Sequence, residues 1–331
     1  MAILVMAVLL ALVTTLLAGL VWLTLRIFKF RRHARGTAKS ALCIYAAALP
    51  LLLFLVLPLL TSYFIANAST RPMDLTLIDT PMELGRPFET ISFPSRDGLA
   101  LSAWYLPGED SKPPIVFAHG LFRNRQEVRE IACRMNELGY PGLLFDFRNH
   151  GKSSKGSTTL GRLERLDILG AVDFLKKAHG ADQVFLLGIS MGAVSSIMAA
   201  SDEPDSIAGI VADSPFDTLQ NTVSQHVWLL LRLPRFPFSN LFVWNLERLG
   251  EFSGADLDAV KALQSLSTVP VLLVYGQDDQ RMPETVATRL YDAAASPNKK
   301  LFIVPGAGHG QAFRTNPDKY VKAVADFVST F

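Results

Sequence analysis

The chain has 331 residues, half of them apolar, and a formal net charge of +2. Its basic residues are dispersed apart from one cluster, so the sequence shows no surface of the kind that binds nucleic acid. Of the two cysteines, Cys43 lies within an apolar run near the N-terminus and Cys133 lies in the more polar remainder, so the sequence indicates neither a disulfide framework nor a cysteine-based metal site.

Two apolar runs occupy the N-terminal region. Residues 2–25 and 40–70 contain no charged side chain, and roughly 20 apolar residues suffice to cross a bilayer as a helix. We therefore expect residues 1–68 to form a transmembrane hairpin, with helices over about 2–25 and 41–64. The basic residues of the loop 29–39 place that loop in the cytoplasm. This predicts a two-pass protein of the inner or plasma membrane whose remaining domain is extracytoplasmic.

A cleaved signal peptide is the alternative for either run. The second run could end at the small residues Ala66 and Ala68, but both runs are longer than a usual signal-peptide core, and the first has no basic residue before it.

Residues 69–88 carry three prolines among mixed polar residues, the profile of a semi-extended linker. Short β-rich runs and amphipathic helical stretches then alternate from residue 89 to residue 331. Strands are expected near Glu89–Phe93, Leu99–Tyr105, Pro114–His119, Gly142–Asp146, Gln183–Leu187, Gly209–Ala212, Val269–Tyr275 and Lys300–Val304. Helices are expected near Arg125–Leu138, Leu160–His179, Met191–Ala200, Met282–Ala294 and Asn316–Ser329.

This alternation predicts an α/β domain, in which a mostly parallel sheet is covered by helices on both faces. Reactive residues should then gather at the carboxyl ends of the strands. One segment, residues 214–256, interrupts the alternation of strands and helices. It is rich in aromatic and aliphatic side chains, and we interpret it as a helical lid.

The segment Gly188-Ile189-Ser190-Met191-Gly192 has the G-x-S-x-G pattern of a nucleophile elbow, between a predicted strand and a predicted helix. A serine on such a sharp turn needs neighbours without a Cβ, because the strand and helix backbones approach closely around it. The following helix directs its N-terminus at the reacting oxygen, where its dipole favours negative charge. Ser190 is therefore the candidate nucleophile.

A serine hydroxyl is a weak nucleophile at neutral pH, so it needs a base and a group that orients the base. His309 lies on a glycine-rich loop after the last predicted strand and is the candidate base. Asp278 and Asp279 follow the preceding strand; we choose Asp279 to orient His309, and one of the pair should also cap the turn.

The oxyanion formed on attack needs two backbone donors. The amide of Met191, directly after the nucleophile, supplies one, and that of Leu121, after an early strand, supplies the other. His119 is interpreted as a residue that shapes this turn. Arg148 with Asp146 is expected to brace the loops around the site.

With these residues in the order Ser190, Asp279, His309, the chain resembles the α/β-hydrolase superfamily across nearly all of residues 89–331. It is similar to the membrane-anchored α/β-hydrolase-domain proteins and to the serine aminopeptidase and prolyl-oligopeptidase-like branch. The matching segments are His119-Gly120 with Asn124 and Arg125, Asp146-x-Arg148-x-His150-Gly151-x-Ser153, and Asp213-Ser214-Pro215-Phe216. The resemblance implies an eight-stranded sheet and an acyl-transfer mechanism, and it favours Asp279, four residues before Pro283, as the acid. Two membrane-spanning runs depart from the single anchor expected of these relatives.

We expect a serine hydrolase that cleaves an ester-type bond through an acyl-enzyme, without a metal or an organic cofactor. The apolar lid and the adjacent membrane favour a lipid or long-chain ester, although such residues also serve simply to pack a lid. A peptidase or aminopeptidase and an acyltransferase are alternatives on the same fold. A non-catalytic, membrane-tethered binding protein is a further one.

Overall fold

The computed structural model describes residues 18–19, 22, 26, 54, 56–70 and 79–331. The predicted transmembrane segments 2–25 and 41–64 thus lie largely outside the described residues. In the part of the chain that is described, no helix is long and apolar enough to cross a membrane.

An eight-stranded sheet forms the centre of the domain, in the order β1-β2-β4-β3-β5-β6-β7-β8. The strands are β1 (Glu89–Pro94), β2 (Ala100–Leu106), β3 (Ile115–Ala118), β4 (Gly142–Phe145), β5 (Val184–Ile189), β6 (Ile207–Asp213), β7 (Val271–Gly276) and β8 (Lys299–Val304). Strand β2 is antiparallel to both of its neighbours, and all the other neighbouring pairs are parallel. The predicted, mostly parallel sheet is therefore confirmed, with small shifts at the strand ends.

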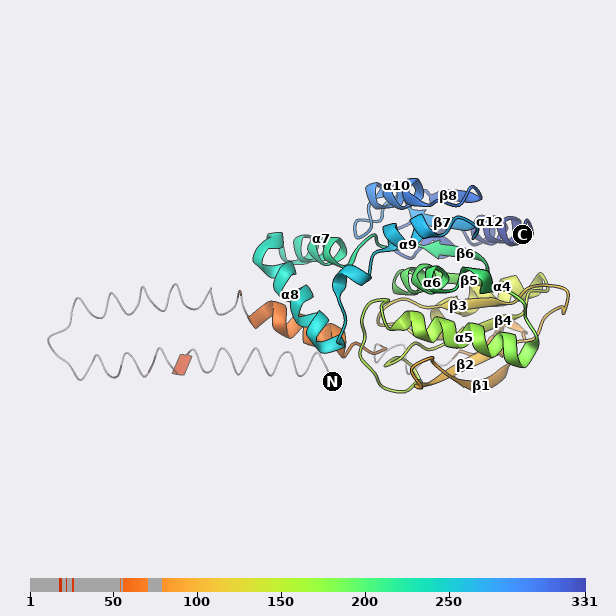
Figure 1. The fold of residues 1–331 in the computed structure, drawn as a ribbon, viewed down its shortest axis with the longest axis horizontal. Coiled ribbons are helices and arrows are strands. Elements are labelled where there is room, and N and C mark those ends of the chain that lie inside the picture. Colours follow the sequence, from red (N-terminus) through yellow and green to blue (C-terminus); the bar gives the residue numbers. More distant parts are fainter. Residues whose placement is uncertain (1–17, 20–21, 23–25, 27–53, 55, 71–78) are drawn as a thin grey trace.

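The helices are α4 (Arg129–Glu137), α5 (Glu164–His179), α6 (Met191–Asp202), α7 (Leu219–Leu231), α8 (Arg235–Gly250), α9 (Ala259–Ser265), α10 (Glu284–Ala293), α11 (Ala312–Thr315) and α12 (Pro317–Val328). Figure 1 shows α5 and α6 in front of the sheet and the lid helices α7 and α8 beside it. The short helices α9 and α11 were not predicted.

Each face of the sheet carries its own apolar core, because the central strands alternate between the faces. In β3, Val116 joins the core under α5 and α6, whereas Phe117 joins the core under α4 and α12. In β5, Leu186 likewise joins the core under α5 and α6, and Leu187 joins the core under α4 and α12. Both helical layers thus hold β5 in place, and β5 ends at the candidate nucleophile.

The start of α5 illustrates how a local turn overrides a helical pattern. The helix was predicted from Leu160 but begins at Glu164. Leu160 and Gly161 both have positive φ angles, of 62° and 131°, which a right-handed helix excludes. The carboxylate of Glu164 closes this turn by accepting hydrogen bonds from the backbone of Thr159 and Gly161, at 2.8 and 2.7 Å.

The predicted lid consists of α7 and α8, followed by a 3-10 turn at Gly254–Asp256. Residues 56–66 form a helix that packs along α8. The ring of Phe54 lies 4.5 Å from that of Phe238, and the side-chain amide of Asn245 donates to the Ser62 hydroxyl at 2.7 Å. The C-terminal end of the predicted segment 41–64 thus contacts the lid.

The chain after this helix is fastened to the domain before the predicted domain start at residue 89. The carbonyl of Ala68 accepts a hydrogen bond from the Asn149 side chain at 2.9 Å. The buried Thr70 hydroxyl donates to the Arg123 carbonyl and accepts from the Gly151 amide, both at 2.7 Å. The described residues of the predicted linker 69–88 also include a 3-10 turn at Pro81–Leu84.

Candidate active site

Ser190 occupies the turn between β5 and α6 with φ 53° and ψ −111°. Its amide donates to the Asp213 carbonyl at 2.8 Å, which fixes this strained conformation at the end of the neighbouring strand. The two flanking glycines are required by space. A Cβ on Gly192 would lie 2.3 Å from the carbonyl oxygen of Ala118, and one on Gly188 would lie 2.3 Å from the backbone of Gly192.

His309 and Asp279 lie beside Ser190, as the order of the strands predicts. The Nε2 atom of His309 is 2.9 Å from the Ser190 hydroxyl, and its Nδ1 atom is 2.7 Å from Oδ2 of Asp279. The carboxylate can only accept, so Nδ1 carries the proton and Nε2 is left free to accept the hydroxyl proton. The three side chains therefore form a continuous hydrogen-bonded chain.

The second oxygen of Asp279 fixes the carboxylate. Oδ1 accepts from the amides of Arg281 and Met282, at 2.8 and 2.9 Å, so one buried residue both orients His309 and closes the turn before α10. The adjacent Asp278 is exposed. The sequence left open which of the two aspartates caps the turn, and in the structure Asp279 makes these contacts.

The two predicted oxyanion donors come from different strands. Met191 begins α6, and Leu121 follows β3. Neither amide makes a hydrogen bond with a described residue. The loop that carries Leu121 is fixed on both sides: the Gly120 amide donates to Glu127 at 2.6 Å, and the Phe122 amide donates to Nε2 of His150 at 3.3 Å.

His119 and His150 brace this loop as neutral rings. Burial lowers the pKa of both, that of His119 to well below its usual range. Each donates from Nδ1 to a backbone carbonyl, of Gly120 at 2.7 Å and of Arg148 at 2.8 Å. His119 thus shapes the turn as predicted, and the contact from His150 to the Phe122 amide is one that the sequence did not indicate.

The expected pairing of Arg148 with Asp146 is not found. The buried guanidinium of Arg148 instead binds Asp167 at 2.7 Å and Asp97 at 2.8 Å. Asp146 accepts from the Arg125 amide at 2.8 Å and lies 3.4 Å from its guanidinium. Asp146 and Arg148 both lie in the irregular loop after β4, which ends at Phe145, so no strand or helix periodicity relates the directions of their side chains.

A second buried carboxylate lies behind the His309 loop. Asp213 ends β6 and accepts from the Ser214 hydroxyl at 2.9 Å, and that hydroxyl accepts from the Gly310 amide at 3.1 Å. Burial raises the pKa of Asp213 to about 7. In the sequence, the Asp213-Ser214 pair stands out only as part of the resemblance, without an assigned role.

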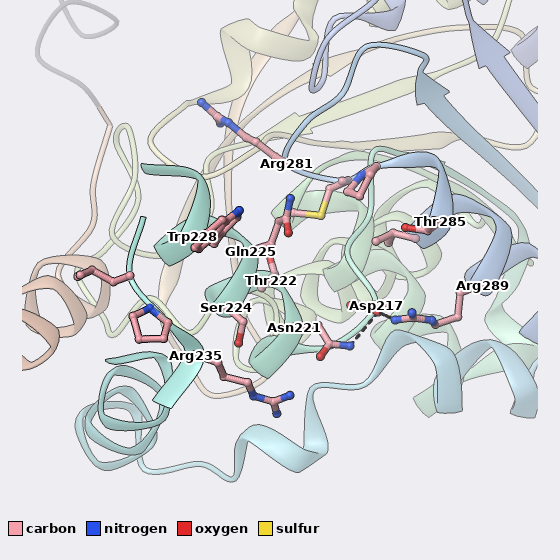
Figure 2. A pocket seen from close by; sticks show the side chains of 15 residues that line it. Asp217, Asn221, Thr222, Ser224, Gln225, Trp228, Arg235, Arg281, Thr285 and Arg289 are labelled. Atoms are coloured by element: carbon pink, nitrogen blue, oxygen red, sulfur yellow. Dashed lines mark hydrogen bonds and ion pairs between the residues drawn. The ribbon is translucent and has the colours of Figure 1, made fainter. Parts of the chain in front are cut away.

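A cavity of about 440 Å³ lies between α7, the α7–α8 turn and α10 (Figure 2). Its walls include Trp228, Met282 and three arginines, and Ser190 and His309 do not line it. Figure 2 shows Arg289 and Asn221 directed at the buried Asp217, which holds both. The cavity therefore borders the loop that carries Asp279 and leaves the serine to one side.

In the described ranges, no three histidine, cysteine or acidic side chains are grouped so that they could hold a metal ion. The arrangement of Ser190, His309 and Asp279 at the carboxyl edge is that of an α/β-hydrolase. A family model described as the alpha/beta hydrolase fold matches residues 113–253. Over these residues the chain is similar to the α/β-hydrolase superfamily, and its eight-stranded, mostly parallel sheet has the fold of that superfamily.

Individual relatives give further comparisons. The uncharacterized protein YqkD of Bacillus subtilis is 26% identical over 237 residues, covering 71% of this chain and 77% of that protein. The uncharacterized membrane protein YNL320W of Saccharomyces cerevisiae is 24% identical over 258 residues, covering 76% and 83%. A solved esterase of Pyrococcus furiosus matches with a TM-score of 0.66 and 24% identity over 80% of this chain and 98% of its own. At this identity, the structural likeness extends to the fold alone.

Proposed function

We propose that the protein is a serine hydrolase that cleaves an ester through an acyl-enzyme intermediate, with Ser190 as nucleophile, His309 as base and Asp279 as the residue that orients it. The observation that carries this proposal is the hydrogen-bonded chain from the Ser190 hydroxyl through His309 to Asp279, with separations of 2.9 and 2.7 Å. Ser190 also has the strained elbow conformation that presents its hydroxyl to a substrate.

In the first half of the reaction, Nε2 of His309 takes the hydroxyl proton as Oγ of Ser190 bonds to the acyl carbon. The carbonyl oxygen becomes an oxyanion held by the amides of Leu121 and Met191. Collapse of this intermediate breaks the ester bond, and the leaving alcohol takes the proton from His309.

In the second half, water attacks the acyl carbon while His309 accepts one of its protons. The bond to Oγ breaks, the proton returns to Ser190, and the carboxylic acid leaves. Asp279 stabilises the histidine cation that forms in each half.

An ester substrate is supported by the esterase among the similar structures. For the acyl chain we propose a long apolar group, because the lid is dense in aromatic and aliphatic residues and residues 2–25 and 41–64 are suited to a membrane anchor. The yeast relative is described as a membrane protein. The cluster of basic residues in 29–39 favours an extracytoplasmic hydrolase domain.

Labelling with a fluorophosphonate probe tests the nucleophile. The full-length protein in detergent should be labelled, and Ser190→Ala and His309→Ala should not. Ser201→Ala is the matched control, because this serine lies near the far end of α6 and its hydroxyl donates to the Met198 carbonyl at 2.8 Å. Equal labelling of wild type and Ser190→Ala refutes the mechanism.

A series of p-nitrophenyl esters tests the acyl group. The ratio kcat/KM should rise with chain length, and a steep preference for acetyl esters contradicts the apolar acyl substrate. Added alcohol distinguishes acyl transfer, which would yield a new ester in place of the acid.

A further inference from the structure

The connection between the two lid helices exposes large apolar side chains. Leu230 is 70% exposed and Phe236 is 77% exposed, while Trp228 and Leu231 are about half exposed. Soluble proteins rarely leave such residues clustered at one turn unless the turn meets an apolar partner. We call residues 228–236 the lid turn.

The charges around the lid turn are of one sign. From Thr218 to Leu246 the sequence holds no aspartate or glutamate, whereas Arg232 and Arg235 lie within the turn itself. The guanidinium of Arg232 lies 5.7 Å from the centre of the Trp228 ring. Farther along α8, that of Arg248 lies 4.6 Å from the centre of the Trp244 ring. Tryptophans beside arginines are typical of segments at a bilayer surface, where the ring occupies the interface and the guanidinium binds phosphate.

The direction of the N-terminal chain indicates which surface the lid turn faces. Phe54 contacts Phe238 near the start of α8, and Ser62 contacts Asn245 farther along it, so the helix 56–66 runs parallel to α8. Its N-terminal end therefore lies at the same end of α8 as the lid turn, as Figure 1 also shows. The apolar residues of 41–53 precede this end in the sequence.

We propose that the lid turn is a bilayer-contacting surface. Leu230, Leu231 and Phe236 insert among the acyl chains, and Arg232 and Arg235 bind lipid phosphates. The proposal rests on the membrane anchor proposed above, and it adds that the lid itself enters the bilayer interface.

Substrate access follows from this placement. Trp228 and Arg235 also line the cavity between the lid and α10 (Figure 2), so one wall of that cavity lies at the membrane. A bilayer-resident ester would reach the domain from this side, without crossing water.

Depth-dependent quenching tests the contact in the full-length protein reconstituted in phospholipid nanodiscs. Cys43→Ala removes one native thiol, and the buried Cys133, whose pKa burial raises to about 11, resists labelling. An environment-sensitive fluorophore is then attached at Leu230→Cys. The matched control is the exposed Lys177→Cys, near the C-terminal end of α5, at the opposite edge of the sheet from the active site.

Nitroxide-bearing lipids should quench the label at residue 230 several-fold more than the label at residue 177. Equal quenching at both positions overturns the proposal, as does a signal at residue 230 that appears only with two protein copies per disc, which would indicate a contact between copies. Leu231→Cys repeats the measurement at a second exposed position.

Two controls test the membrane anchor and the catalytic site separately from the lid contact. Protein that fails to co-purify with the discs refutes the anchor, and loss of fluorophosphonate labelling refutes the integrity of the site. Leu230→Asp gives a functional readout: turnover of a soluble short ester should be unchanged, while turnover of a long-chain ester embedded in the bilayer should fall several-fold. Equal effects on both substrates contradict the proposal.

Discussion

Asp213 is a buried carboxyl group whose ionisation should lower the stability of the folded protein. Burial raises its pKa from 3.8 to about 7, so the folded protein retains a proton between these pH values that the unfolded chain has already released. The free energy of unfolding must therefore fall as pH rises through this window. The difference of about 3 pH units corresponds to about 4 kcal/mol in total, since each unit is worth about 1.4 kcal/mol.

Asp213→Asn should remove this dependence, because asparagine has the shape of the protonated acid and still accepts from the Ser214 hydroxyl. The difference in the free energy of unfolding between variant and wild type should therefore grow in favour of the variant by roughly 3 kcal/mol between pH 5 and pH 7. For a domain of this size, the Tm of the variant minus the Tm of wild type should be roughly 5–10 °C larger at pH 7 than at pH 5.

Thermal unfolding followed by tryptophan fluorescence at pH 5, 6, 7 and 8 measures this difference, and other titrating groups cancel because they are common to both proteins. Asp278→Asn is the matched control, since Asp278 is exposed. A Tm difference between Asp213→Asn and wild type that stays constant over the pH range would refute the assignment of a raised pKa to this residue.

Three further substitutions test the site and its supports. Asp279→Asn should lower kcat for ester hydrolysis by about four orders of magnitude through loss of the histidine tautomer, whereas Asp278→Asn should change it little; equal losses would contradict the choice of acid. Gly192→Ala places a Cβ 2.3 Å from the Ala118 carbonyl oxygen and should destabilise the fold by about 3 kcal/mol. A lower Tm would show this loss, whereas an unchanged Tm would mean that the backbone at the elbow relaxes without cost. Arg148→Met leaves the buried carboxylate of Asp167 without its cation and should lower the free energy of unfolding, measured by denaturant, by about 3–5 kcal/mol. Full retention of stability would show that this ion pair is dispensable.

The features that were predicted correctly are those encoded by local pattern. The strands follow from apolar runs bounded by turns, and the elbow follows from the two glycines around Ser190. The closeness of His309 to Ser190 followed from topology, because parallel strands bring their carboxyl ends to one edge.

The features that escaped prediction depend on contacts between distant segments. The partners of Arg148 are 51 and 19 residues away in sequence, and no periodicity identifies them. The late start of α5 depends on a left-handed turn at Leu160, which the residue type disfavours and which Glu164 stabilises. The role of Asp213 depends on burial beneath a loop that arrives 96 residues after Ser214.

The same edge of the sheet also explains why the site is held rigidly. Ser190 follows β5, Asp213 ends β6, Asp279 follows β7 and His309 follows β8, so four neighbouring strands each contribute one polar group. Backbone hydrogen bonds link these ends directly: the Ser190 amide binds the Asp213 carbonyl, and the Ser214 amide binds Val274 in β7, both at 2.8 Å. Displacing any one strand end would shift the next, because the loops share these bonds. The inserted segment between β6 and β7, which carries α7 and α8, is joined to the sheet outside this set of strand-end hydrogen bonds.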